Sequence, residues 1–191
     1  MIQDNPIELF GKWYENVSSK EKTAVVLATC NKNALPSARV VLLKEYSTEG
    51  FVFFTNINSR KGQELKENPR AALVFYWNEL GTQVRVEGNV KLLDEEKTDK
   101  YFASRERESQ ISAWCSKQSH VMESLQDFEQ DINLMREKFH DKKIQRPSFW
   151  VGFCIKAEVI EFWQAGEHRR HIRLRYTAIQ KNKWKVEQLY P

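Results

Sequence analysis

The chain has 191 residues, of which 41% are hydrophobic and 12% aromatic, so it is long enough to bury the core of one domain. No apolar run approaches the ~20 residues that span a bilayer, and the N-terminus lacks the basic and apolar segments of a signal peptide. The net charge of +4 is too small to indicate a nucleic-acid partner by itself. We therefore expect a globular protein that works with neither a membrane nor a nucleic acid.

Residue spacing argues against several kinds of site. The cysteines, Cys30, Cys115 and Cys154, are isolated and odd in number, which indicates reduced thiols in a cytoplasmic protein. The glycines never form G-x-G-x-x-G, and the chain has no P-loop, no H-E-x-x-H and no G-x-S-x-G. His168 and His171 are close in sequence, but no further cluster of ligands completes a metal shell. We predict no metal site.

Capping residues and apolar periodicity predict four helices. Asn5 is the N-cap of a helix over residues 5–18, which carry apolar side chains at helical spacing. Ser59 and Asp94 are the N-caps of two further helices, the second of which runs toward Arg105. Apolar residues every three or four positions predict an amphipathic helix over the whole of residues 119–139.

Short runs of β-branched and aromatic residues, separated by turns, predict the strands. The turn at residues 47–50 predicts a hairpin between its two flanking strands. Because strands do not alternate with helices, we expect a mainly β fold, an antiparallel closed or split barrel with flanking helices. We see no repeat or linker, so residues 1–191 form one predicted domain. The predicted strands are residues 23–30, 38–46, 51–56, 71–77, 82–93, 149–162, 173–180 and 184–189.

Residues 161–173 hold two of the four histidines and three arginines. If the chain after Gly166 runs as a strand, the two-residue period places Arg169, His171 and Arg173 on one face. Such a face is either an exposed basic edge, which protects a strand from aggregation, or one side of a site for an anionic or electron-rich ligand.

Other cations lie beside hydroxyl groups, the usual equipment for binding phosphate monoesters. Ser59, Arg60 and Lys61 stand at a predicted helix start, where free amides and a partial positive charge favour an anion. Tyr101 and Arg105 are predicted on one helix face, four residues apart. Two phosphate sites are therefore predicted, from Arg39, Lys44, Ser59, Arg60, Lys61, Tyr101, Arg105 and Ser109.

Eight motifs occur in one order along the chain. They are R-V-V-L-L-K (39–44), F-T-N with S-R-K (54–61), Q-V-R-V-E-G (83–88), Y-F-A-S-R (101–105), S-Q-I with A-W (109–114), S-K-Q-S (116–119), P-S-F-W (147–150) and E-F-W-Q with G-E-H-R (161–169). With these motifs in register, the chain resembles the pyridoxamine 5'-phosphate oxidase family from about Asn5 to Pro191.

The resemblance implies a homodimer of FMN-binding split β-barrels, Greek-key-like, with FMN at the subunit interface. It also implies that the single domain includes a C-terminal dimerisation and substrate segment, at about residues 149–191. The implied activity is FMN-dependent oxidation of pyridoxamine 5'-phosphate and pyridoxine 5'-phosphate to pyridoxal 5'-phosphate in vitamin B6 metabolism, with O2 reduced to H2O2. Because the chain begins almost at the first helix, we expect it to lack the longer N-terminal arm that helps cover the substrate in family members.

The resemblance also assigns roles to single residues. The substrate phosphate is expected at Lys44, Tyr101, Arg105 and Ser109. Arg169 and His171 are the expected catalytic residues and face the pyridine ring, in either a proton-transferring or an orienting role. The expected FMN contacts are Arg39, Val40, Val41, Leu42, Phe54, Thr55, Ser59, Arg60, Lys61, Gln83, Gln118, Ser119, Trp163 and Arg173, and the flavin phosphate is expected at Arg39, Arg60, Lys61 and Ser119.

Three other functions remain open from the sequence. A related flavin oxidase, such as one of phenazine biosynthesis, would keep the FMN residues without needing Lys44, Tyr101, Arg105 and Ser109. A noncatalytic protein that binds FMN or pyridoxal phosphate would have the same motifs. A nucleic-acid-binding barrel would expose aromatic residues among cations on one face, whereas the aromatic residues here mostly follow core periodicity.

Overall fold

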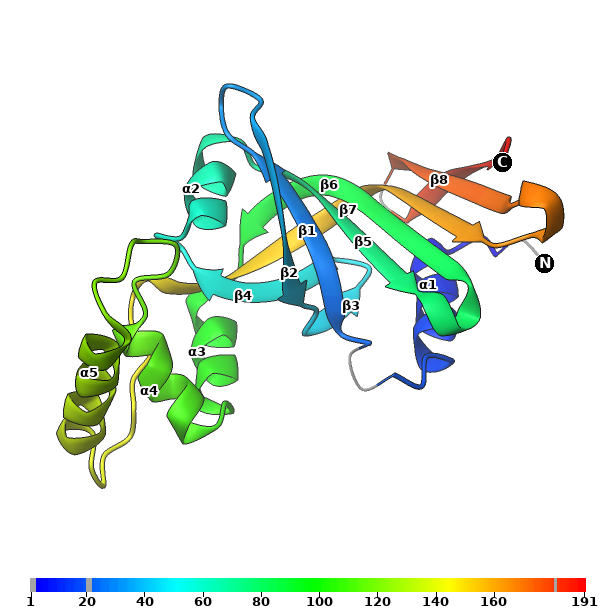
Figure 1. The fold of residues 1–191 in the computed structure, drawn as a ribbon. Helices are drawn as coiled ribbons and strands as arrows, with labels where there is room; N and C mark the ends of the chain where they lie inside the picture. The colour runs from blue at the N-terminus through cyan, green and yellow to red at the C-terminus, as the bar shows by residue number, and fades with distance from the viewer. Residues whose placement is uncertain (1–2, 20–21, 181) are drawn as a thin grey trace.

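The computed structural model describes residues 3–19, 22–180 and 182–191. Its strands form one curled antiparallel sheet in the order β2-β1-β5-β6-β7-β4-β3, and β8 pairs with both β7 and β9 (Figure 1). The expectation of a mainly β, antiparallel fold is confirmed. The strands are β1 (Ala24–Cys30), β2 (Pro36–Leu42), β3 (Glu45–Ser47), β4 (Gly50–Asn56), β5 (Arg70–Trp77), β6 (Thr82–Leu92), β7 (Trp150–Gln164), β8 (Ile172–Gln180) and β9 (Lys183–Leu189).

The helices lie around the ends of this sheet. In Figure 1, α3, α4 and α5 gather at one end, near β4, while α1 lies toward the other end, on the side of the β8–β9 hairpin. Asn5, Ser59, Asp94 and Ser124 cap helices with side-chain oxygens. The helices are α1 (Pro6–Glu15), α2 (Arg60–Glu67), α3 (Glu95–Ala103), α4 (Arg107–Cys115) and α5 (Leu125–Lys138). No helix among the described residues is long and apolar enough to cross a membrane.

Two apolar clusters stabilise the fold. Phe10 of α1 is fully buried in the larger cluster and meets the rings of Tyr46, Phe51 and Phe75 edge-on at about 5 Å. The smaller cluster contains Phe102 of α3, together with residues of α4, α5 and β7. It therefore attaches the helical end of the molecule to the sheet.

A bulge interrupts the long β6–β7 pair. Glu87 pairs with Val159 and Gly88 with Ala157, so Glu158 is the extra residue. A Cβ at Gly88 would lie 2.0 Å from the carbonyl oxygen of Lys156. This approach requires glycine at the point where the two strands change register.

The hairpin predicted between residues 38–46 and 51–56 is wrong in its first strand. That stretch divides at Leu43, which is buried. The part before it is β2, which pairs with β1 at one edge of the sheet, and only the short β3 pairs with β4 at the other. A continuous apolar run concealed this division, because strand periodicity does not report which neighbour a strand has.

The helix predicted over residues 119–139 is also too long. It begins at Leu125, after the cap Ser124, and Ser119 has a left-handed backbone with φ 72°. Met122, which continues the apparent apolar stripe, is exposed. The separate helix α4 was not predicted.

Candidate active site

A cavity of about 780 Å³ opens where β2 and β4 meet the starts of α2 and α4. It brings together most of the residues predicted to bind FMN and the substrate phosphate. The lining includes Arg39, Val40, Val41, Leu42, Lys44, Phe54, Thr55, Lys61, Tyr101, Arg105, Ser109 and Gln118. Ser119, by contrast, lines a neighbouring cavity that shares Gln118 with this one.

The first turn of α2 forms one end of the site. The hydroxyl of Ser59 accepts from the Gly62 N–H at 3.4 Å and donates to the Asn56 carbonyl at 2.6 Å. Lys61 is buried, and its Nζ donates to neutral oxygens, including Gln118 Oε1 at 3.0 Å. Burial lowers the pKa of Lys61 to about 8; the charge of Arg39 adds to this effect and that of Glu64 opposes it. A buried ammonium ion with neutral partners favours an incoming anion.

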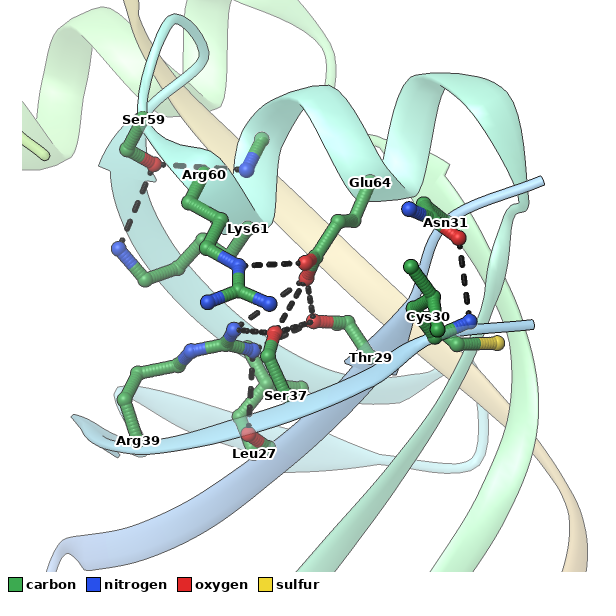
Figure 2. A network of polar contacts seen from close by, with 12 residues as sticks. Leu27, Thr29, Cys30, Asn31, Ser37, Arg39, Ser59, Arg60, Lys61 and Glu64 are labelled. Atoms are coloured by element: carbon green, nitrogen blue, oxygen red, sulfur yellow. Dashed lines mark hydrogen bonds and ion pairs between the residues drawn. The ribbon is translucent and has the colours of Figure 1, made fainter. Parts of the chain in front are cut away.

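Arg39 and Arg60 extend this end, although Arg60 does not itself line the cavity. Figure 2 shows both guanidinium groups beside the carboxylate of Glu64. We name Arg39, Ser59, Arg60 and Lys61 the α2 seat. Glu64 was not predicted as a site residue, although its position four residues after Arg60 is the spacing of a helical ion pair.

The other end of the site holds the four residues predicted for the substrate phosphate. The prediction that Arg105 lies on the same helix face as Tyr101 is wrong, because α3 ends at Ala103. Arg105 follows the helix, and its Nη1 is buried without a hydrogen-bond partner among the described residues. Burial lowers the pKa of Arg105. Such a guanidinium has an unused donor for an anion in the cavity.

A column of stacked rings supports these cations. The ring of Phe54 stacks on Tyr101 at 4.1 Å and on Trp150 at 4.9 Å. Lys44 lies over Tyr101 at 5.9 Å, and Arg105 lies over Trp150 at 5.0 Å. Tyr101 and Trp150 are themselves near-parallel at 6.2 Å, and each of these two rings has a cation against it.

A third group lies outside the cavity, on the central strands. Gln83, Trp163 and Arg173 are cross-strand neighbours on β6, β7 and β8. Arg173 donates to the buried Glu161 at 2.8 Å and to the Tyr190 carbonyl at 3.1 Å. Sheet register thus aligns three predicted FMN contacts that are far apart in sequence.

The turn between β7 and β8 differs from the strand predicted there. Residues Glu167–Arg169 form a short 3-10 turn, and His168 and Arg169 have positive φ values of 51° and 63°. The prediction of Arg169, His171 and Arg173 on one strand face is therefore wrong. A Cβ at Gly166 would lie 2.1 Å from the Arg170 carbonyl, so the chain folds back there and β8 begins only at Ile172.

Within this β7–β8 turn, His171 is held more firmly than Arg169. Its ring lies 4.6 Å from that of Trp163, and its Nδ1 accepts from the Gly166 N–H at 3.3 Å. A neutral imidazole in this arrangement carries its proton on Nε2. Arg169 is exposed.

One chain does not bring the β7–β8 turn to the cavity. Neither Arg169 nor His171 lines it. In Figure 1 the turn lies at the opposite end of the sheet from α3, α4 and α5. The expected catalytic pair and the expected phosphate sites are therefore separate in the single chain.

Comparison with known proteins gives consistent matches. A family model described as Pyridoxamine 5'-phosphate oxidase matches residues 16–139, and one described as Pyridoxine 5'-phosphate oxidase C-terminal dimerisation region matches residues 150–191. The chain is 61% identical over 193 residues to the Pyridoxine/pyridoxamine 5'-phosphate oxidase of Wolbachia pipientis wMel, a match that covers 100% of this chain and 89% of that protein. It is 54% identical to the protein of the same name from Ehrlichia chaffeensis, over 100% of both chains.

Among solved structures, PhzG from Burkholderia lata 383, in complex with tetrahydrophenazine-1-carboxylic acid, superposes with a TM-score of 0.93 at 30% identity, over 99% of this chain and 94% of that one. A pyridoxamine 5'-phosphate oxidase-related, FMN-binding protein from Nostoc punctiforme shares the fold, with a TM-score of 0.75 at 15% identity, over 96% of this chain and 95% of that one. The chain therefore belongs to the pyridoxamine 5'-phosphate oxidase family.

Proposed function

We propose that the protein oxidises pyridoxamine 5'-phosphate and pyridoxine 5'-phosphate to pyridoxal 5'-phosphate, with FMN as cofactor and O2 as the final electron acceptor. The observation that carries this proposal is the presence of two cationic groups in one cavity. Arg39 and Lys61 of the α2 seat line one end, and Lys44, Tyr101, Arg105 and Ser109 line the other. This arrangement suits a cofactor and a substrate that each carry a phosphate.

The residues present fit FMN. Lys61 has a buried charge with neutral partners, and Arg39 and Arg60 flank it. Val40, Val41 and Leu42 supply an apolar wall to the cavity, suited to a flat ring system. When bound, FMN supplies a two-electron acceptor that O2 regenerates with formation of H2O2.

The chain's own residues bind and orient. Lys44 and Arg105 hold the substrate phosphate, with the hydroxyls of Tyr101 and Ser109 as further hydrogen-bonding groups. Fixing the phosphate at one end of the cavity limits where the reacting carbon of the pyridine can lie. His171 donates from Nε2 to the substrate rather than removing a proton, because its Nδ1 is engaged by the Gly166 N–H.

The site is completed by a homodimer. The match of residues 150–191 to a dimerisation region supports this assembly. Val40 and Leu42 support it too, because they are apolar residues of the cavity wall that a single chain leaves exposed. In the dimer the β7–β8 turn of one copy meets the cavity of the other, which brings Gln83, Trp163, Arg169, His171 and Arg173 to FMN and the substrate.

Two measurements test the function. Purified protein should be yellow and release FMN on denaturation, and it should convert pyridoxine 5'-phosphate and O2 to pyridoxal 5'-phosphate and H2O2. A colourless protein that takes up no added FMN would contradict every flavin-dependent function. Bound FMN without turnover would favour a carrier of FMN or pyridoxal phosphate.

A second candidate is oxidation of a phenazine precursor, which the similarity to PhzG favours. Such a substrate needs no phosphate site. Competition by inorganic phosphate therefore separates the candidates, because it should raise KM only for a phosphorylated substrate.

The free state of Cys30, Cys115 and Cys154 supports a cytoplasmic location.

A further inference from the structure

Glu64 lies at the centre of a hydrogen-bond network to which none of the roles above gives a function (Figure 2). Its side chain is almost fully buried on α2, one turn after Arg60. Oε1 accepts from Arg60 Nε at 2.9 Å. Oε2 accepts from Ser37 Oγ at 2.6 Å, from Thr29 Oγ1, and from Arg39 Nη2 at 3.3 Å. Donors from β1, β2 and α2 thus converge on one carboxylate.

The two hydroxyls connect Glu64 to Arg39 a second time. Thr29 and Ser37 each accept from an Nη group of Arg39 and donate to the carboxylate. Arg39 Nη1 also donates to the Leu27 carbonyl at 3.2 Å. Both Nη groups are therefore fixed, and the guanidinium cannot rotate without breaking several hydrogen bonds.

Arg60 is held in a different way. Only its Nε is bonded to Glu64, while most of its side chain is exposed. Its two Nη groups have no hydrogen-bond partner among the described residues, so they can form a fork toward a phosphate. Without the carboxylate, a long exposed side chain beside another guanidinium would turn into solvent.

The charges at the α2 seat match a phosphate. Burial opposes ionisation of Glu64, but hydrogen bonds from Ser37, Thr29 and Arg60 outweigh it and lower the pKa of Glu64 to about 2. The carboxylate is thus ionised at neutral pH. Three cations, Arg39, Arg60 and Lys61, less this one anion, leave two positive charges. A phosphate monoester carries close to two negative charges at neutral pH.

We propose that Glu64 is a positioning residue for the cofactor phosphate: it holds Arg39 and Arg60 side by side and sets the net charge of the seat. The proposal rests on the binding of FMN at the α2 seat. It assigns Glu64 no contact with the phosphate, since its oxygens accept from four donors already.

The test is a flavin titration of the apoprotein, followed by the fluorescence of the flavin. Glu64→Gln keeps the size of the side chain, but its amide N–H2 replaces one acceptor, so one arginine loses its partner. FMN should bind ~10-fold or more weakly, the loss expected for one charge-assisted hydrogen bond. Riboflavin, which has the same ring system without the phosphate, should bind within about twofold of wild type.

The matched control is Glu67→Gln. It makes the same charge change on the same helix, at an exposed residue whose carboxylate accepts from the Lys32 N–H. FMN affinity should be unchanged.

A double-mutant cycle shows whether Glu64 acts through Arg60. In the Arg60→Ala background, Glu64→Gln should cost clearly less FMN affinity than it costs in wild type. Three outcomes would each overturn the proposal. They are losses of FMN affinity that add up in the double mutant, equal losses of FMN and riboflavin affinity for Glu64→Gln, and unchanged or tighter FMN binding by Glu64→Gln. Wild-type protein that binds neither flavin would instead contradict the proposed function.

Discussion

The cations of the α2 seat are buried or paired within one chain, whereas in the β7–β8 turn Arg169 is exposed and His171 is held by a backbone N–H. At the seat, Lys61 is almost fully buried and Glu64 connects two arginines. In the turn, Arg169 is exposed at a positive φ. His171 is fixed by a backbone N–H rather than by a carboxylate.

This contrast separates a part of the site that is preformed from one that depends on assembly. A network of side chains from β1, β2 and α2 keeps its geometry in a single chain. A strained turn with few side-chain contacts needs another surface to define its position. Substitutions in each of the two parts therefore test this division.

Subunit mixing tests whether the two regions meet across a dimer. Lys61→Met damages the seat and Arg169→Met damages the turn, and each homodimer should lose ~100-fold in kcat/KM. A purified heterodimer of the two variants should regain about half of the wild-type activity, because one of its two symmetric sites receives both intact parts.

The mixing experiment has a clear opposite outcome. If the seat and the turn of one chain formed each site, every site in the heterodimer would carry one defect. Activity would then stay at the level of the homodimers. Flavin content serves as the control, since Arg169→Met should retain FMN.

Arg105→Met tests the other end of the cavity. Loss of a partly buried cation whose Nη1 has no partner among the described residues should raise KM for pyridoxine 5'-phosphate by ~10- to 100-fold, equivalent to about 1.5–3 kcal/mol. FMN affinity should not change. Arg107→Met, at an exposed residue of α4, is the control, and a fall in FMN affinity for Arg105→Met would show that the two phosphate sites are not distinct.

The pH dependence of FMN binding should report Lys61. Its pKa is lowered to about 8 in the free chain, and a bound phosphate dianion would raise it. FMN binding therefore takes up a proton above pH 8, and affinity should fall there by up to about tenfold per pH unit. Flavin titrations between pH 7 and 10 (on the order of seven points) measure this slope. Lys61→Met should bind weakly with no such slope.

Ser59→Ala should give the smallest effect. The hydroxyl caps α2 and is fully buried, so its loss should destabilise the fold by about 1 kcal/mol. For a chain of this length that corresponds to a melting temperature lower by ~2–4 °C. Thermal unfolding followed by circular dichroism measures the shift. An unchanged melting temperature would show that the Ser59 cap does not stabilise the fold.

Local signals predicted much of the fold. The caps Asn5, Ser59 and Asp94 act within a few residues, and each is confirmed. Long-range pairing was harder to predict from sequence. β2 pairs with β1 instead of β4, because the partner of a strand depends on contacts across the whole sheet. The β7–β8 turn was missed because strand periodicity gives no sign of a chain reversal at Gly166.

The same difference between local and long-range contacts decided which site residues could be predicted. The cations and hydroxyls predicted to bind phosphate were recognisable from sequence, and most of them line the cavity, although Ser59 and Arg60 at the helix start do not. Glu64 was missed because Thr29, Ser37 and Arg39 meet it only after β1, β2 and α2 have packed together. Its helical spacing from Arg60 alone does not distinguish it from a surface ion pair.

The bulge between β6 and β7 has a consequence for how this chain tolerates insertions and deletions. Glu158 is partly exposed, and its ion pair with Arg70, at 2.7 Å, is a surface contact that substitution removes at little cost. On β7 the buried side chains of the larger apolar cluster have odd numbers before the bulge, as at Phe153 and Ile155, and even numbers after it, as at Ile160 and Phe162. Deletion of Glu158 would therefore restore regular alternation and leave these side chains on the core face. The bulge is thus a point where β7 can lose one residue without turning its core side chains to the opposite face.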